Sequence, residues 1–165
     1  MKDKLILDVN KKKVWYGAEV LKVRDLFSRK EEKGSNITKS DDKFFSNYWQ
    51  VYAWAAIIGF INNKRITGAT LDNRTSFEYQ VISNASESIS YALILMAIGK
   101  IEAQTSAEIL DAREILTIIS EYAEGGAKHV LELRETPGLE SKFNYADDYF
   151  LEIFERVVSP KEVEA

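Results

Sequence analysis

Hydrophobic residues along most of this chain follow the spacing of α-helices. They recur at intervals of three and four, which places them on one face of a helix. The predicted helices lie at about residues 18–30, 42–62, 105–124 and 145–158, with further helical segments after residue 75 and at 128–135. We therefore expect an all-α fold, a single compact bundle of six or seven helices that spans residues 1–165.

The segment at residues 42–62 is apolar around most of its circumference. Two adjacent stripes at helical spacing cover it, one made of Phe44, Tyr48, Tyr52 (or Val51), Ala55 and Gly59 and the other of Phe45, Trp49, Ala56 and Phe60. A helix of this kind must be covered by its neighbours or by a partner chain. We expect it to be central in the fold and to offer a partner interface, for which the candidate residues are Phe44, Tyr48, Trp49 and Tyr52.

Short motifs mark the predicted ends of these helices. The side-chain oxygens around Asp41 predict one helix start, and residues 75–78 and 105–108 each fit a capping box. The pair Gly125 and Gly126 predicts a helix end, because glycine adopts the left-handed cap conformation without steric cost. The continuous apolar run at residues 91–98 predicts a fully buried segment.

The N-terminal segment departs from helical spacing. Residues 5–9 and 14–16 are rich in aliphatic and aromatic side chains, and they flank a polar turn at 10–13. This arrangement predicts a short β-hairpin as an addition to the helical fold.

The composition argues against several classes of catalytic site. The chain has no cysteine, which removes disulfides, thiolate metal sites and cysteine nucleophiles. His129 is the sole histidine, so a histidine-dependent triad or metal site has little to draw on. No glycine motif for phosphate or dinucleotide binding is present. We expect a non-catalytic protein without a cofactor or a bound metal.

The apolar runs are short. The longest, at residues 51–61, is well below the roughly 20 residues that a membrane helix needs. The apolar patch at residues 5–7 is too short for a signal peptide. Together with the lack of cysteine, these features predict a cytoplasmic protein with no membrane partner.

Charge is distributed unevenly between the two halves of the chain. Residues 1–74 hold 15 Lys and Arg against 9 Asp and Glu, whereas residues 75–165 hold 7 against 17. A basic half can bind nucleic-acid phosphates by releasing counterions, although solvated helix surfaces would produce the same asymmetry. The candidate DNA-contact residues are Lys11, Lys12, Lys13, Lys64, Arg65 and Arg74.

A metal-dependent enzyme is the competing prediction. Small helical hydrolases and nucleases hold a metal with carboxylates three residues apart, since this spacing directs both at one ion. Pairs at this spacing are Asp111 with Glu114, Glu121 with Glu124, Glu132 with Glu135 and Glu152 with Glu155. The solvent face of an acidic helix has the same pattern.

Two segments carry a family resemblance. The first is the alanine-rich aromatic stretch at residues 53–60 with the basic turn at 63–66, and the second is residues 121–126 with Leu131 and Leu133. Together they resemble small accessory proteins encoded beside bacterial DNA-phosphorothioation (Dnd) modification and restriction genes. The resemblance implies a role in defence against foreign DNA, and it carries over no catalytic residue.

These observations lead to one functional prediction. We expect a non-catalytic helical subunit of a bacterial anti-phage defence or DNA-processing complex. Its partners would be a larger protein subunit and, through the basic half, the backbone of duplex DNA. Self-assembly into a homo-oligomer is a further alternative.

Overall fold

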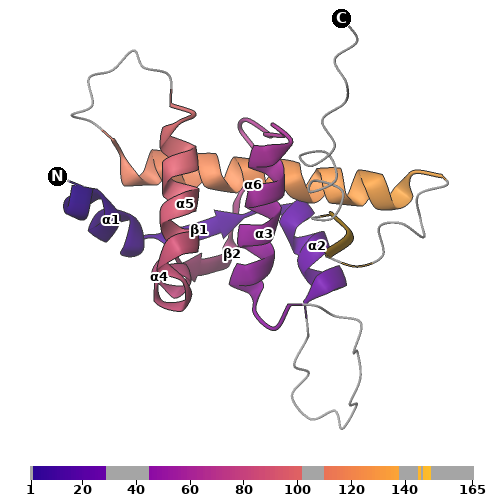
Figure 1. The fold of residues 1–165 in the computed structure, drawn as a ribbon, viewed down its shortest axis with the longest axis horizontal. Coiled ribbons are helices and arrows are strands. Elements are labelled where there is room, and N and C mark those ends of the chain that lie inside the picture. The colour runs from indigo at the N-terminus through magenta and orange to yellow at the C-terminus, as the bar shows by residue number, and fades with distance from the viewer. Residues whose placement is uncertain (1, 29–44, 102–109, 138–144, 146, 150–165) are drawn as a thin grey trace, which may run out of the picture.

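The computed structural model describes residues 2–28, 45–101, 110–137, 145 and 147–149. Within these ranges it is mostly helical, with one small two-stranded antiparallel sheet (Figure 1). The helices are α1 (Lys2–Asn10), α2 (Ala18–Phe27), α3 (Tyr48–Ile61), α4 (Gln80–Ala85), α5 (Glu87–Ile98) and α6 (Ala112–Glu135), and the strands are β1 (Lys13–Tyr16) and β2 (Asp72–Glu78). The predicted predominance of helix is confirmed.

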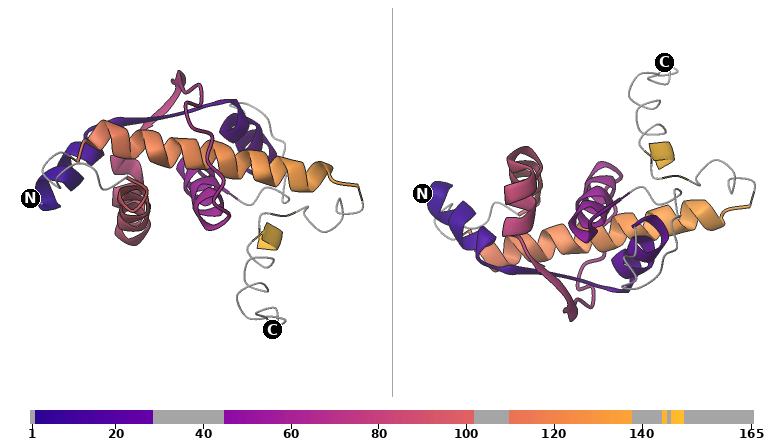
Figure 2. Two further views of the ribbon diagram at one scale, coloured as in Figure 1. Left: turned by 90° about the horizontal axis from the view of Figure 1, so that it is seen from above. Right: turned by 90° about the horizontal axis from the view of Figure 1, so that it is seen from below.

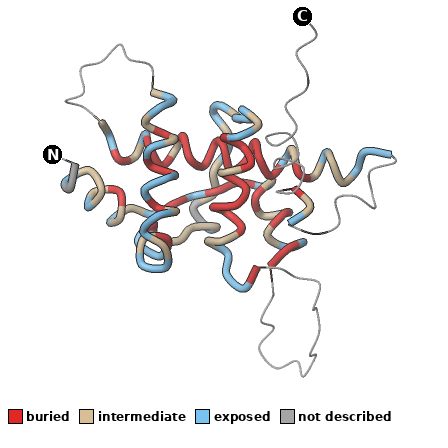
Figure 3. The backbone as a smooth tube through the Cα atoms, in the orientation of Figure 1, coloured by how far each residue is buried: buried red, intermediate tan, exposed pale blue. Residues whose placement is uncertain are grey.

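Helix α6 is the long element on which the others are arranged. Helices α3 and α5 cross it on one side, and β1, β2 and α2 lie on the opposite side (Figure 2). Buried residues follow α3 and the middle of α6, as Figure 3 shows. The core therefore centres on the crossing of these two helices, in agreement with the central position predicted for α3.

The predicted N-terminal hairpin is wrong. Residues 5–9 belong to α1, and β1 pairs with β2, which follows more than fifty residues later in the chain. In this antiparallel pair Val14 lies opposite Phe77 and Trp15 lies opposite Ser76. The pairing buries Val14 and Tyr16 against the core, which a local hairpin on the surface would not do.

The predicted capping box at residues 75–78 is also wrong, because these residues lie in β2. The Thr75 hydroxyl does not cap a helix. Its Oγ1 lies 2.7 Å from the carbonyl oxygen of Tyr16 and 2.8 Å from that of Asp72, so it supports the strand pairing. The same short motif serves either structure, and the tertiary contacts decide which one forms.

The predicted helix end at Gly125 and Gly126 is wrong as well, since α6 continues to Glu135. A Cβ atom on Gly126 would overlap the carbonyl oxygen of Ala55 and lie 2.6 Å from the amide nitrogen of Gly59. A Cβ atom on Gly125 would overlap the backbone of Lys64. These glycines allow the helices to approach closely, and they remain helical.

Other predicted boundaries shift. Residues 45–47 are not helical, and α3 begins at Tyr48, where the Gln50 side chain accepts a hydrogen bond of 3.1 Å from the Asn47 amide. Helix α6 begins at Ala112 and is capped by Asp111. The motifs predicted around Asp41 and at residues 105–108 lie outside the described residues.

Two further predictions concern burial. The run at residues 91–98 is only partly buried, because Tyr91 and Leu95 on α5 are exposed. Of the last predicted helix, residues 145 and 147–149 are described. Tyr149 is buried there, with its ring 5.5 Å from that of Trp54 and 6.3 Å from that of Phe27. Tyr149, Phe27 and Trp54 therefore form an aromatic cluster between α2 and the middle of α3.

Candidate functional site

Helix α6 carries two buried glutamates, Glu121 and Glu124, where it passes α3 and α2. The Glu121 carboxylate accepts hydrogen bonds from Arg65, with its Oε2 2.7 Å from Nε and 2.6 Å from Nη2. Its other oxygen accepts from the amide of Gly68 at 2.9 Å. Glu121 therefore ties the loop after α3 to α6 by a partly buried ion pair.

Glu124 caps a different element. Its carboxylate accepts hydrogen bonds from the backbone amides of Gly17 at 2.6 Å, Glu19 at 3.0 Å and Val20 at 3.3 Å. These are free amides at the start of α2, whose N-cap residue Gly17 has no side chain. Burial raises the pKa of Glu124 above its ordinary value, and the three amides oppose that shift.

This geometry bears on the carboxylate pair that sequence spacing offers as a metal site. Glu121 and Glu124 are bonded to different groups, an arginine and a helix start, so they do not share a ligand. Across the described part of the chain no group of three or more His, Asp or Glu side chains is placed to hold a metal ion. Glu152 and Glu155 lie outside the described residues. The observed role of the buried pair is structural.

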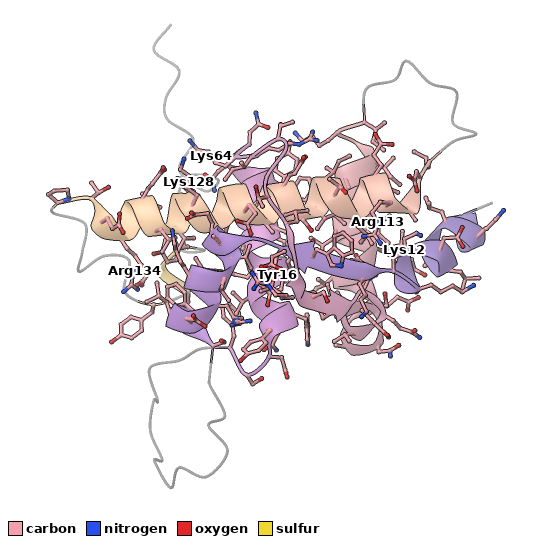
Figure 4. All side chains as sticks on the ribbon, turned by 180° about the vertical axis from the view of Figure 1, so that it is seen from behind. Lys12, Tyr16, Lys64, Arg113, Lys128 and Arg134 are labelled. Atoms are coloured by element: carbon pink, nitrogen blue, oxygen red, sulfur yellow. The ribbon has the colours of Figure 1, made fainter. Side chains whose placement is uncertain are left out.

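The six candidate DNA-contact residues do not form one surface. Lys12 lies beside the start of α6, whereas Lys64 lies near Lys128 in its C-terminal half (Figure 4). Arg65 is paired with Glu121. Arg74 is paired with Asp72 at 2.7 Å, and the hydrogen bonds from Arg74 hold the pKa of Asp72 below its ordinary value. The two paired arginines are therefore less available to phosphates than sequence position suggests.

Lys11, Lys12 and Lys13 stay together, and the structure adds two residues that the sequence analysis missed. Arg113, at the start of α6, donates from Nη1 to the carbonyl oxygen of Lys13 at 3.0 Å. Its guanidinium lies 5.0 Å from the ring centroid of Trp15, which is 37 % exposed. We call Lys11, Lys12, Lys13, Trp15 and Arg113 the Trp15 surface. Burial alternates along β1 and exposes Lys13 and Trp15, but the sequence Lys-Val-Trp-Tyr does not indicate which aromatic residue is exposed, and nothing local pointed to Arg113.

Of the four predicted partner-interface residues, one lies outside the described residues, two reach the surface and one is buried. Phe44 lies outside the described residues. Tyr48 is exposed, with the Arg24 guanidinium 4.4 Å from its ring centroid, and Trp49 is half-buried.

Tyr52 was wrongly predicted to be an interface residue, because it is fully buried. Its hydroxyl shares a hydrogen bond of 2.8 Å with that of Ser120, and its ring lies 5.4 Å from that of Phe77. The side of α3 that carries Tyr52 faces α6 and the strands, so the outward side lies elsewhere.

An apolar surface covers the outward sides of α3 and α5. Its exposed members include Leu95 at 58 % and Ile61 at 52 % exposure. Beside them a hollow of about 310 Å³ is lined by Phe45, Ser46, Trp49, Gln50, Ala53, Trp54, Ile57 and Ile89. We call Ile57, Ile61, Ile89, Tyr91, Ala92 and Leu95, together with this hollow, the α3–α5 face. Helix α3 has no charged residue and α5 has only Glu87 at its start, a sequence signal that could have indicated the face.

Comparisons with known proteins add no relative. No protein-family model, curated protein or solved structure matches the chain. Among the described helices, none combines the length and the apolar character that crossing a membrane requires.

Proposed function

We propose that the chain is a non-catalytic helical subunit that docks on a larger protein through the α3–α5 face. The observation that carries this proposal is the exposure of large apolar side chains on α3 and α5, two helices whose one charged residue is Glu87 at the start of α5. Large apolar side chains such as Leu95 and Ile61 lose about 25 cal/mol per Å² by staying in water, so their burial against a partner is favourable.

The α3–α5 face has the features of a helix-docking surface. Ser88, Tyr91, Ala92 and Leu95 follow the i, i+3, i+4, i+7 spacing along the outward side of α5. Ala92 is small and allows close approach of a second helix, while Tyr91 and Leu95 supply contact area. The neighbouring hollow beside Trp49 and Ile57 is large enough for an anchoring aromatic or aliphatic side chain of the partner.

We place this subunit in a bacterial anti-phage defence or DNA-processing complex in the cytoplasm. The support is the resemblance of residues 53–60, 63–66 and 121–126 to accessory proteins of Dnd systems. Contact with the DNA backbone is a second candidate function. Lys11, Lys12 and Lys13 favour it, because among the described residues none of the three forms an ion pair.

Docking is tested with the full chain carrying an affinity tag, expressed in the cells that produce it. Crosslinked complexes are purified and compared by mass spectrometry between the parent chain, Leu95→Glu and Ile57→Glu. We expect both substitutions to remove the same partner, because a buried unpaired carboxylate opposes docking. Leu7→Glu is the matched control, since Leu7 on α1 is exposed to a similar extent as Leu95.

The oligomeric state is measured first, by size exclusion with light scattering. If the parent chain is a monomer and Leu95→Glu no longer captures the partner, the proposal is supported. A parent dimer that becomes a monomer in Leu95→Glu would mean that the face binds a second copy. If Leu95→Glu and Ile57→Glu retain every partner of the parent chain, the proposal is wrong.

A further inference from the structure

The Trp15 surface combines cations with an exposed aromatic ring. Lys13 and Trp15 are two residues apart on β1 and both face solvent, while Val14 and Tyr16 face the core. Arg113 reaches the same side from α6 and contacts both the Trp15 ring and the Lys13 backbone. Figure 4 shows Arg113 and Lys12 close together there. Two elements far apart in the sequence therefore build this surface.

The cations of this surface have no carboxylate partner among the described residues. The ion pairs present there involve Lys22, Arg24, Arg65, Arg74 and Lys128. Lys11, Lys12, Lys13 and Arg113 are not among them. The three lysines therefore need no ion pair broken before they meet a phosphate, and they can release counterions on binding. Arg113 already donates one hydrogen bond to the Lys13 carbonyl oxygen.

Carboxylates do lie nearby, and they limit where an anion can bind. Asp8 and Asp111 line a hollow of about 390 Å³ together with Lys11 and Lys12. Glu78 is opposite Lys13 in the strand pairing. Asp111 caps α6 by accepting from the amide of Arg113 at 2.9 Å. Phosphates are therefore expected along the outer rim of the surface and not inside the hollow.

The exposed indole suggests what the surface recognises beyond phosphate. Trp15 lies opposite the small residue Ser76 in the strand pairing, its side chain is partly exposed, and the Arg113 guanidinium lies over its ring. A base can stack on an exposed indole only when it is not held inside a duplex. Stacking on an aromatic ring beside a basic groove is the usual mode by which proteins bind single strands.

We propose that the Trp15 surface binds single-stranded nucleic acid, with a base stacked on Trp15 and phosphates along Lys11, Lys13 and Arg113. The proposal rests on the DNA-contact part of the proposed function and specifies its substrate class. Stacking tolerates any base, so little sequence preference is expected. DNA and RNA strands share the bases and phosphates that this surface would contact, and the experiment separates them.

The test is fluorescence anisotropy with the full chain at about 50 and 200 mM salt, a range over which phosphate contacts weaken strongly. The probes are labelled oligothymidylate and oligouridylate of about 20 nucleotides, enough for one binding site of this size, and a duplex of the same length. The variants are Trp15→Ala, Trp15→Phe and the double variant Lys11→Ala with Lys13→Ala. Trp49→Phe is the control for loss of a tryptophan elsewhere.

We expect the single strands to bind more tightly than the duplex. Trp15→Ala should lose roughly ten- to a hundredfold in affinity for the single strands, the loss of about one stacked base, with the salt dependence unchanged. Trp15→Phe should keep most of the affinity. The double lysine variant should bind single strands and duplex more weakly by a similar factor, and its binding should depend less on salt. A higher affinity for oligouridylate than for oligothymidylate would identify RNA as the preferred strand.

A second readout does not depend on the Ala variant folding normally. Binding of a single strand should quench tryptophan fluorescence in the parent chain and in Trp49→Phe, and the quenching should be much smaller in Trp15→Phe. Equal quenching in Trp15→Phe, or unchanged affinity in a folded Trp15→Ala, would overturn the stacking proposal. In that case a loss of affinity in the double lysine variant would still support contact with the nucleic-acid backbone. If no probe binds at either salt, both the stacking and the DNA-contact proposals are wrong.

Discussion

Glu124 on α6 caps helix α2 across 107 residues of sequence, with its Oε1 2.6 Å from the amide nitrogen of Gly17. A cap is normally supplied by the residue that precedes the helix, but Gly17 has no side chain to offer. A side chain at position 17 would overlap the carbonyl oxygen of Thr70. The glycine and the distant glutamate therefore depend on each other.

Glu124→Ala should destabilise the protein by about 2–4 kcal/mol, because it leaves several buried amides without an acceptor. Urea unfolding followed by circular dichroism measures the change. Glu132→Ala is the control on the same helix, because the Glu132 side chain is 59 % exposed. It should shift the free energy of unfolding by no more than about 0.5 kcal/mol. Equal effects of the two substitutions would contradict the capping role.

The raised pKa of Glu124 predicts a pH dependence of stability. Because burial raises this pKa in the folded state, the folded protein binds more protons than the unfolded chain between the two pKa values. The stability that this pKa shift supplies is therefore fully present below the pKa that Glu124 has in the unfolded chain. It is lost as pH rises through the pKa that Glu124 has in the folded protein. Glu124→Gln does not titrate, so the free energy of unfolding of the parent, relative to this variant, should fall as pH rises from about 4. A difference that is flat or rises with pH would contradict this.

Gly126→Ala should be strongly destabilising, because the added methyl group overlaps the carbonyl oxygen of Ala55 on α3. Overpacking of this kind costs typically about 1–3 kcal/mol or more. Gly99→Ala is the control, since a Cβ atom there meets nothing closer than 3.5 Å. Thermal unfolding should show a large fall in Tm for Gly126→Ala and little change for Gly99→Ala. A normal Tm for Gly126→Ala would mean that the two helices are not packed this closely.

Tyr52→Phe should destabilise by about 0.5–1.5 kcal/mol, since it removes the partner of the buried Ser120 hydroxyl. The double variant Tyr52→Phe with Ser120→Ala should recover part of this loss, because no buried hydroxyl then lacks its partner. Tyr48→Phe is the exposed control on the same helix and should be nearly neutral. Because Tyr52 is buried, Tyr52→Phe should also leave partner capture unchanged, which distinguishes it from Leu95→Glu.

Divalent metals should leave the stability of the parent chain unchanged. Glu121 and Glu124 already bind Arg65 and the start of α2, so an added ion would have to break these bonds. Thermal shift with Mg²⁺ or Mn²⁺ measures this directly, since a ligand that binds the folded state raises Tm. A rise in Tm that disappears in Glu121→Ala with Glu124→Ala would revive the metal-dependent hydrolase.

The sequence by itself determined the helical class and the central position of α3. Both follow from the spacing of residues that are close in the sequence. Because α3 is apolar on nearly all sides, it must be covered whichever elements surround it. The cluster Lys11 to Lys13 was also evident, because its members are adjacent in the chain. Local periodicity is sufficient for features of this kind.

Only the tertiary structure decided which local signals prevailed. Gly125 and Gly126 resemble a helix end, yet they lie inside α6 because α3 passes too close for a side chain. Residues 75–78 resemble a helix start, yet they pair with β1. The partners of Glu124 and of Trp15 come from segments about a hundred residues away. Contacts over such separations depend on how whole elements pack, and the spacing of adjacent residues does not reveal that packing.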